Sequence, residues 1–259
     1  MLVDSHCHLN YPGLIDRQDE VLDAARDRGV GAFLNISTRQ GEWSDIIATA
    51  EAYDDVWASV GVHPHEADSH PDLGAAALID ASEHPRVIGI GECGLDYFYD
   101  KSDRVAQRER FLAHIEAARR TGLPLIVHTR DAEEDTAEIL TQAVREGGIS
   151  GVLHCFTSSA ELARQALDIG FYISLSGIVT FKNARDLQET AKQIPSDRLL
   201  VETDAPFLAP VPNRGKTCEP AFVADTAAFV AELRGEPREQ LAEATTANFY
   251  RLFAKARQP

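Results

Sequence analysis

Two histidines stand one residue apart near the start of the chain, within the stretch VDSHCHLN at residues 3–10. We interpret this stretch as a β-strand, in which successive side chains point to opposite faces. One face would then carry Asp4, His6 and His8. The residues between them would face the other way: Val3, Ser5 and Cys7. Two imidazoles at this spacing can bind one metal ion, but the motif is short and its meaning depends on the rest of the chain.

Similar polar residues recur at the ends of other apolar runs. Six of the nine histidines occupy such positions: His6, His8, His63, His65, His128 and His154. Carboxylates follow the same pattern: Glu92, Asp96, Glu202 and Asp204. The remaining histidines are interpreted as incidental loop or helix residues: His70, His84 and His114. If the six converge, two divalent cations held by four histidines and two carboxylates, one of them bridging, would offset the cost of desolvating so many polar groups.

The elements that must bring these residues together are short apolar strands. Eight β-branched and apolar runs alternate with segments of helical periodicity along the 259 residues. This alternation predicts parallel strands joined by crossover helices. We expect one domain, residues 1–259, folded as a closed (β/α)8 TIM barrel whose metal site lies at the C-terminal mouth of the strands. A doubly wound open sheet is the alternative, although no Gly-x-Gly-x-x-Gly fingerprint follows the first run.

Three helices can be placed from the sequence in more detail. One is expected over residues 103–120, with Ser102 or Asp103 as its N-cap and Gly122 near its end. Its apolar stripe would consist of Val105, Phe111, Leu112 and Ile115. Two more helices are expected at about residues 218–234 and 237–254, and the second would close the bottom or the flank of the barrel.

The cysteines suggest packing rather than metal binding. Four are present and none forms a C-x-x-C pair: Cys7, Cys93, Cys155 and Cys218. Free thiols are therefore expected. Cys7, Cys93 and Cys155 each adjoin a candidate ligand. The neighbour of an inward-facing strand residue points outward, so we expect these three side chains to lie in the helix layer.

The charge of the chain limits its partners. It contains 25 Lys and Arg against 41 Asp and Glu, for a net charge of −16, which is unlike a protein that coats duplexes. Bound metal ions could still supply local positive charge for a nucleic-acid substrate. Apolar runs long enough to span a bilayer and a secretory signal are both missing, so we expect a cytoplasmic protein without membrane contact. No obligate protein partner is evident.

Taken together, several motifs resemble those of the TatD-like metal-dependent deoxyribonucleases of the amidohydrolase superfamily. They are HCHL, GVHPH, GECGLDYF, PLIVHTRDA, GVLHCFT, LLVETDAPFL and NRGKTCEPA. The resemblance extends from Asp4 to about Pro220. Ser158 stands where the family often has glycine, and Cys218 where it often has asparagine; both departures bear on substrate preference more than on metal binding. Glu92 takes the place of the superfamily's usual bridging carbamylated lysine.

This resemblance implies a two-metal hydrolase that acts on ester bonds. One ion would be held by four residues: His6, His8, Glu92 and Asp204. The other would be held by Glu92, His128 and His154. Two such ions lower the pKa of a shared water and neutralise charge on the attacking and leaving oxygens. The ions could be Mg, Mn, Zn, Co, Ni or Fe, and histidine-rich ligation suits transition metals better than magnesium.

The remaining site residues are expected to act on the substrate or to support the ligands. We name three catalytic residues: Asp204 as general base, His63 and Glu92. His63 would reach a substrate phosphate or leaving group, or else pack under the turn at Pro64. The residues expected to contact substrate are His63, His65, Asp96, Arg130, Arg214 and Lys216; the three cations would clamp phosphate oxygens. Asp4 and Glu202 would hold the ligand imidazoles in place.

The function favoured by these features is a deoxyribonuclease that cleaves single-stranded or frayed DNA, including in a 3′-to-5′ exonuclease mode, with a water activated by two metals. Three alternatives remain open. An amidohydrolase or lactonase for a small molecule and an esterase for aminoacyl-tRNA would use the same centre. A non-catalytic metal-binding scaffold would fill every ligand position with protein.

Salt dependence tests how such an acidic chain binds DNA. Two divalent ions neutralise only a quarter of a net charge of −16, so binding must depend on a few contacts at the mouth. If two or three phosphates are neutralised, log affinity against log salt should have a slope of roughly −1.4 to −2. The measurement uses a short single strand, fixed free metal and an inactive variant that keeps its metals. A slope steeper than about −4 would reveal an extended basic track.

Overall fold

The computed structural model describes residues 1–99 and 101–256, and its strands form one parallel sheet in chain order. The strands are β1 (Leu2–Cys7), β2 (Val30–Asn35), β3 (Val56–Val60), β4 (Val87–Asp96), β5 (Leu125–Arg130), β6 (Gly151–Leu153), β7 (Tyr172–Leu175) and β8 (Leu199–Val201). The α-helices are α1 (Gln18–Asp27), α2 (Trp43–Ala52), α3 (Ala75–Ser82), α4 (Arg104–Thr121), α5 (Glu133–Gly147), α6 (Ala160–Asp168), α7 (Arg185–Gln193), α8 (Val223–Arg234) and α9 (Arg238–Leu252).

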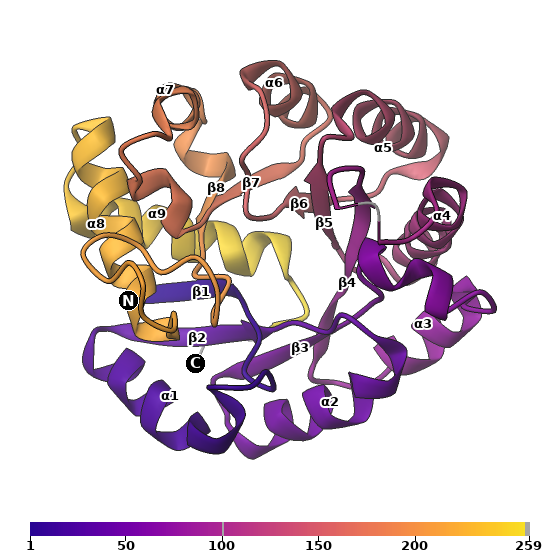
Figure 1. Ribbon diagram of the computed structural model, residues 1–259, viewed down its shortest axis with the longest axis horizontal. Coiled ribbons are helices and arrows are strands. Elements are labelled where there is room, and N and C mark those ends of the chain that lie inside the picture. Colours follow the sequence, from indigo (N-terminus) through magenta and orange to yellow (C-terminus); the bar gives the residue numbers. More distant parts are fainter. Residues whose placement is uncertain (100, 257–259) are drawn as a thin grey trace.

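The sheet closes on itself where its first and last strands meet. The Ser5 hydroxyl donates to the Val201 carbonyl at 3.0 Å, and a parallel bridge joins Cys7 to Ala205. Helices surround the strands in Figure 1. The predicted (β/α)8 barrel is therefore confirmed, and the open doubly wound sheet is wrong. In the described part of the chain, every helix is too short or too polar to cross a membrane.

Two apolar layers stabilise the barrel. Side chains that point inward, such as Val3 and Ile126, pack in one cluster with Phe249, Leu252 and Phe253 from the C-terminal end of α9 and the residue after it. This last helix thus closes one end of the barrel, as the sequence predicted. A larger cluster lies between the outer face of the sheet and the surrounding helices. The C-terminal end of the strands, opposite α9, is left for polar residues.

Strand β1 departs from the expected alternation of faces. Val3 belongs to the interior cluster, and the Ser5 hydroxyl lies 3.1 Å from that of Ser174, so neither faces outward as predicted. Asp4 pairs with Phe33 of β2, and the register is irregular between Asp4 and Cys7. Strict alternation therefore fails here, and Asp4 does not share a face with the two histidines that follow it.

Helix α4 begins at the expected cap, although its apolar stripe is partly wrong. The Asp103 carboxylate accepts from the backbone N–H of Val105 at 2.8 Å. Phe111 and Ile115 are buried as predicted, but Val105 is 64% exposed and Leu112 is 53% exposed. Part of the inner face is polar instead, because it binds the backbone of the loops at the barrel mouth.

Gln107 and His114 are the polar residues on that inner face. The Gln107 side chain accepts from the backbone N–H of Asp96 at 2.8 Å and donates to its carbonyl at 3.0 Å. His114 Nε2 accepts from the Val62 N–H at 3.0 Å, and Nδ1 donates to the Arg110 carbonyl at 2.7 Å. Burial lowers the pKa of His114 to about 4, so the ring stays neutral as these bonds require. His114 is thus a structural anchor rather than an incidental helix residue.

We expect His114→Leu to lower the free energy of unfolding by about 1–3 kcal/mol, because the buried Val62 N–H loses its acceptor. His84→Leu is the matched control: His84 Nδ1 also accepts a backbone N–H, that of Arg86 at 3.3 Å, but His84 is partly exposed, so water can replace the lost acceptor. Its effect should stay within about 0.5 kcal/mol. Urea unfolding of both variants measures the difference. Equal effects of the two substitutions would contradict the anchoring role.

Candidate metal centre

The Glu92 side chain of β4 is buried among histidine nitrogens, and each of its oxygens faces a different group. Oε2 lies 3.4 Å from His6 Nε2 and 4.0 Å from His8 Nε2. Asp204 Oδ1 completes this group, at 3.6 Å from His6 Nε2 and 3.3 Å from His8 Nε2. Ligand atoms about 2.0–2.1 Å from a tetrahedral ion lie about 3.3–3.4 Å apart. The spacing is therefore close to what a shared ion requires.

The other carboxylate oxygen faces the second group. Oε1 lies 2.8 Å from His154 Nε2, 3.3 Å from His128 Nδ1 and 3.3 Å from His63 Nε2. A carboxylate that bridges two ions presents its oxygens in this way. The structure thus brings together all six predicted ligands. That they bind ions remains a prediction.

The surroundings of the His6 ring indicate that a metal would fit among these residues. It is fully buried, and within the described residues neither Nδ1 nor Nε2 has a hydrogen-bond partner. Burial lowers the pKa of His6, so the ring is neutral and can act as a ligand. Its ring stacks on that of His154, with 3.8 Å between centroids. A buried nitrogen without a partner is costly, and a cation at Nε2 would remove that cost.

The electrostatics of the centre keep the Glu92 carboxylate ionised. Burial alone would raise the pKa of Glu92, but the imidazoles of His154 and His63 hold it well below the usual range. Burial likewise disfavours a charged His154, yet the carboxylates of Glu92 and Glu202 raise its pKa well above the usual value. Metal ligands must be deprotonated, so a bound cation would replace the protons that now balance this negative charge.

Backbone geometry places the ligands on the strand ends. Asp204 follows β8 in the left-handed region at φ 60°, and its N–H donates to the His6 carbonyl at 2.9 Å. On β4, Gly94 has φ 128°, and a Cβ atom there would lie 2.0 Å from the His128 carbonyl oxygen. Only glycine allows β4 and β5 to approach this closely. Gly94 therefore determines how close His128 of β5 lies to Glu92 of β4.

Asp96 supports the centre rather than the substrate. Its Oδ2 lies 2.8 Å from His65 Nε2 and 3.0 Å from His128 Nε2, and its side chain is fully buried. Its Oδ1 accepts from the N–H groups of Phe98 and Tyr99. These contacts turn Nδ1 of His128 toward Glu92, as partners behind a metal ligand commonly do. The prediction that Asp96 contacts substrate does not agree with its burial.

The two residues expected to hold imidazoles behave differently. Glu202 Oε1 lies 3.3 Å from His154 Nδ1 and accepts from the Cys155 N–H at 2.7 Å, which matches the expected contact. Asp4 instead accepts from the N–H and the hydroxyl of Thr203, at 2.9 and 2.6 Å, and from the N–H of His6 at 3.4 Å. It touches no imidazole because its side chain leaves the inner face of β1. Burial raises the pKa of Asp4 to about 8.

A cavity of about 620 Å³ opens onto this centre. The predicted site residues that line it are His8, His63, His65, Glu92, His128, Arg130, His154 and Asp204. Arg214 and Lys216 do not line it, contrary to expectation: the loop after β8 carries Arg214 over the Phe181 ring, at 4.0 Å, and Lys216 beside Asn213.

Several residues that line the cavity were missed by sequence reasoning: Tyr11, Arg39, Tyr99, Lys101 and Phe207. A signal was available for the three aromatic residues, because Tyr11, Tyr99 and Phe207 each stand three positions after a predicted site residue: His8, Asp96 and Asp204. Side chains that far beyond a strand end often lie over the mouth that the strands form. For Arg39 and Lys101 no comparable signal exists.

The cysteine neighbours follow the expectation in two cases of three. Cys7 and Cys93 lie in the outer layer, where their thiols approach the carbonyls of Leu34 and Ile126 at 3.5 Å. Cys155 lines the cavity instead, with φ 42° and its sulfur 3.1 Å from the Ser176 hydroxyl. The outward prediction is wrong there because β6 ends at Leu153, so strand alternation no longer applies.

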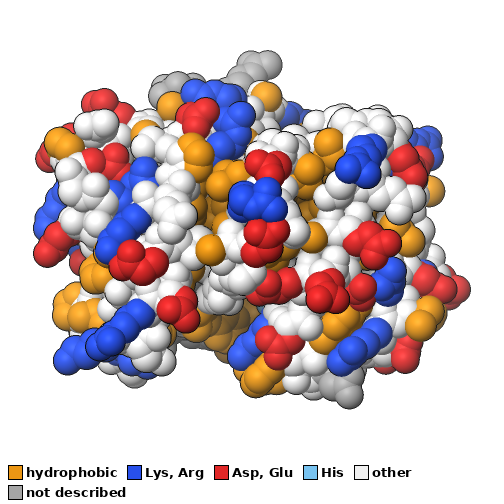
Figure 2. Space-filling model, turned by 90° about the horizontal axis from the view of Figure 1, so that it is seen from above, with side chains coloured by type: hydrophobic (Ala, Val, Ile, Leu, Met, Phe, Trp, Pro, Cys, Tyr) orange, Lys and Arg blue, Asp and Glu red, His pale blue; other side chains and the backbone are white. Residues whose placement is uncertain are grey.

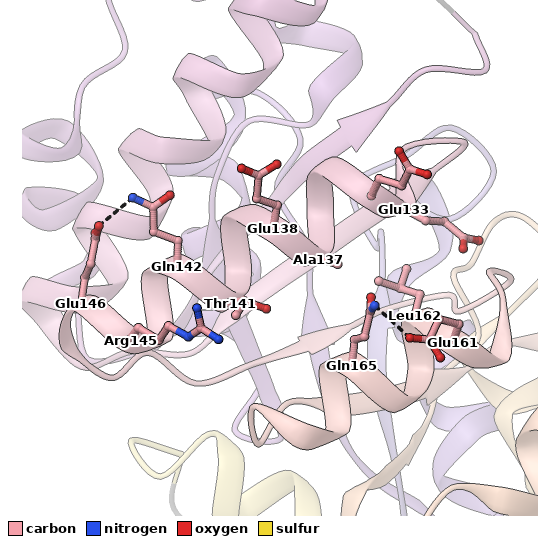
Figure 3. Close-up of a pocket in the computed structure, with 11 residues that line it drawn as sticks. Glu133, Ala137, Glu138, Thr141, Gln142, Arg145, Glu146, Glu161, Leu162 and Gln165 are labelled. Carbon is pink, nitrogen blue, oxygen red and sulfur yellow. Dashed lines mark hydrogen bonds between the residues drawn. The ribbon is translucent and has the colours of Figure 1, made fainter.

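A larger cavity, about 960 Å³, lies between α5 and α6, on the flank where charged side chains line hollows with hydrophobic floors (Figure 2). Figure 3 shows that its polar lining comes from both helices; Gln142 donates to Glu146 at 2.7 Å on α5, and Gln165 donates to Glu161 at 3.0 Å on α6. Among the described residues, no histidine or cysteine lines it. The smaller cavity at the barrel mouth is therefore the candidate site.

Residues 3–254 match the family model described as TatD related DNase. Over 255 residues, or 97% of this chain and 95% of the relative, the chain is 46% identical to the uncharacterized metal-dependent hydrolase YcfH of Escherichia coli K12. It is 35% identical, over 91% of each chain, to the 3′-5′ ssDNA/RNA exonuclease TatD of Klebsiella pneumoniae strain 342. The crystal structure of YJJV, a TatD homologue of Escherichia coli K12, superposes with a TM-score of 0.92 at 29% identity, covering 98% of both chains.

Metal content tests the two donor groups around Glu92. We expect two divalent ions per chain after reconstitution, measured by elemental analysis. His128→Ala should lower this content, whereas Cys7→Ser should keep both ions because its thiol lies in the outer layer. A ceiling of one ion per chain, or loss of metal from Cys7→Ser alone, would show that the donors have been assigned incorrectly.

Proposed function

We propose that this chain, which belongs to the TatD-related DNase family and is a metal-dependent hydrolase, cleaves phosphodiester bonds in single-stranded or frayed DNA. The observation that supports this most is the Glu92 carboxylate, whose two oxygens face two groups of nitrogens beneath an open cavity. Paired ions suit phosphodiester hydrolysis because charge develops on both the attacking and the leaving oxygen. A relative named as an ssDNA/RNA exonuclease, at 35% identity, points to the same class of substrate.

The ions would be held by His6, His8 and Asp204 on one side of Glu92, and by His128 and His154 on the other. When bound, they would lower the pKa of a water and neutralise charge on the phosphate. Asp204 is the residue suited to accept the proton of that water. Burial raises its pKa, but His8 and His6 outweigh burial and keep it ionised. Its side chain is 14% exposed and lines the cavity, so a water can reach it.

His63 is suited to donate a hydrogen bond rather than to bind a metal. Its Nδ1 accepts from the His65 N–H at 3.0 Å, which places the ring proton of the neutral form on Nε2. Burial lowers the pKa of His63 to about 4, so the neutral form predominates at pH 7. Nε2 lies 3.3 Å from Glu92 and lines the same cavity. We infer that this N–H donates to a phosphate oxygen or to the leaving oxygen.

Three cations at the rim would bind further phosphate oxygens. Arg39, Lys101 and Arg130 all line the cavity. Arg39 also pairs with Glu66 at 2.8 Å. This ion pair holds the Arg39 side chain in position and partly neutralises its charge. Charge-assisted hydrogen bonds from such groups are about twice as strong as neutral ones. Their small number agrees with a substrate that enters by one end rather than along a track.

Hydrolysis assays test the proposal. We expect Asp204→Asn to lower DNA hydrolysis by at least about 10²-fold, because the metal would lose a carboxylate ligand and the water would lose its proton acceptor. Cys7→Ser should retain most of the activity. The substrates are single-stranded DNA, duplex DNA, RNA, aminoacyl-tRNA and small esters, each with added divalent metal. Turnover of small esters or aminoacyl-tRNA without cleavage of DNA would overturn the proposed substrate.

A further inference from the structure

Exposed aromatic side chains are concentrated at the mouth of the barrel. Among the described residues, the large hydrophobic side chains that are exposed include three aromatic ones: Phe98 at 52%, Tyr99 at 50% and Phe207 at 48%. Tyr99 and Phe207 line the cavity above the metal centre. Leaving such rings in water forgoes the stabilisation that burial would give them. A cluster of them around a functional cavity therefore indicates a binding surface.

Phe207 forms one wall, beside the ends of β1 and β8. Its ring meets that of Tyr11 edge to face, with 5.9 Å between centroids and 88° between planes. Tyr11 is held in turn by stacking on His8 at 4.7 Å and by a 2.7 Å hydrogen bond to the Thr38 hydroxyl. The Phe207 N–H donates to the Asp204 carbonyl at 2.9 Å. The ring is thus tied to the same turn as the proposed proton acceptor.

Tyr99 forms the other wall and follows the end of β4. Strand β4 lies across the barrel from β1 and β8 (Figure 1). The Arg130 guanidinium lies 4.6 Å from the Tyr99 centroid and 4.0 Å from that of Phe98, and Lys101 lies 5.5 Å from Tyr99. The N–H of Tyr99 donates to Asp96, whose other oxygen contacts His128. This wall is therefore coupled to the second donor group around Glu92.

The two walls combine the groups that single-stranded nucleic acids require. Unpaired bases stack on aromatic rings, and neighbouring cations bind the phosphates between them. Stacking is independent of charge, which matters for a chain with a net charge of −16. Bases within a duplex already stack on each other, so only an unpaired end could use both rings.

We propose that Phe207 and Tyr99 are two base-stacking positions for unpaired nucleotides, one on each side of the phosphate bound at the metal centre. This inference depends on the proposed function, because it requires a nucleic-acid substrate. It also assigns Arg130 and Lys101 to the phosphates on the Tyr99 side. The ligand chemistry is therefore that of a short single strand with intact bases.

Binding of matched oligonucleotides tests the inference without relying on turnover. The probes are a thymidine pentanucleotide and an abasic pentanucleotide of equal charge, both with phosphorothioate linkages, added to the metal-loaded protein. Stacking on one ring is worth about 5- to 150-fold in affinity, so the wild type should prefer the thymidine strand by at least about 5-fold. Phe207→Ala and Tyr99→Ala should each reduce that preference, and the double variant should nearly abolish it.

Three further variants separate stacking from other effects. Phe207→Trp and Tyr99→Phe keep an aromatic ring and should retain the preference. Leu112→Ala removes a comparably exposed apolar side chain on α4, 53% exposed, and should leave it unchanged. Metal content should be the same in all variants.

The two possible failures can be told apart. Equal affinity of the wild type for both probes, together with cleavage of ordinary single-stranded DNA, would overturn the stacking positions and leave the proposed function intact. Absence of both binding and DNA cleavage would overturn the proposed function and the stacking positions with it.

Discussion

The carboxylate of Glu92 is almost entirely removed from water, and its charge is tolerable there only because each oxygen faces its own group of imidazole nitrogens. An isolated carboxylate in such a place would protonate or destabilise the fold. The imidazoles come from the ends of four strands, β1, β3, β5 and β6, or from the loops that follow them. Closure of the barrel therefore matters for chemistry as well as for stability, because an open sheet would not bring β1 and β5 to the same carboxylate.

A second layer of contacts converts this cluster into a site with defined geometry. Asp96 and Glu202 each hold the outer nitrogen of a histidine, so the inner nitrogen points to Glu92. Gln107 and His114 of α4 hold the backbone at the ends of β4 and β3 in turn. Buried polar groups of this kind stabilise a structure only when all are paired. That requirement explains why part of the inner face of α4 is polar.

The mouth would also reconcile an acidic chain with the polyanionic substrate that we propose. The rim carries Arg39, Lys101 and Arg130, while the α5–α6 groove on the flank is lined largely by glutamates. The one arginine among the described residues that line this groove, Arg145, stands among five glutamates, so the net charge of the groove would repel a phosphate backbone. Affinity must then come from short-range contacts at the mouth, among which the rings of Tyr99 and Phe207 do not depend on charge. Such a surface favours binding of the end of a single nucleic-acid strand over binding along the length of that strand.

The sequence by itself determined the barrel and the identity of the polar residues at its mouth. Parallel strands must alternate with crossover helices, and the carboxyl ends of such strands must meet, so the positions of His6, His128, His154 and Glu92 in the chain were sufficient. Only the tertiary structure decided where side chains beyond the strand ends lie. The irregular register of β1 turned Asp4 away, and the early end of β6 placed Cys155 in the cavity. Loop conformation depends on distant contacts, which local periodicity does not encode: the loop after β8 carries Arg214 to Phe181 and brings Phe207 to the metal centre.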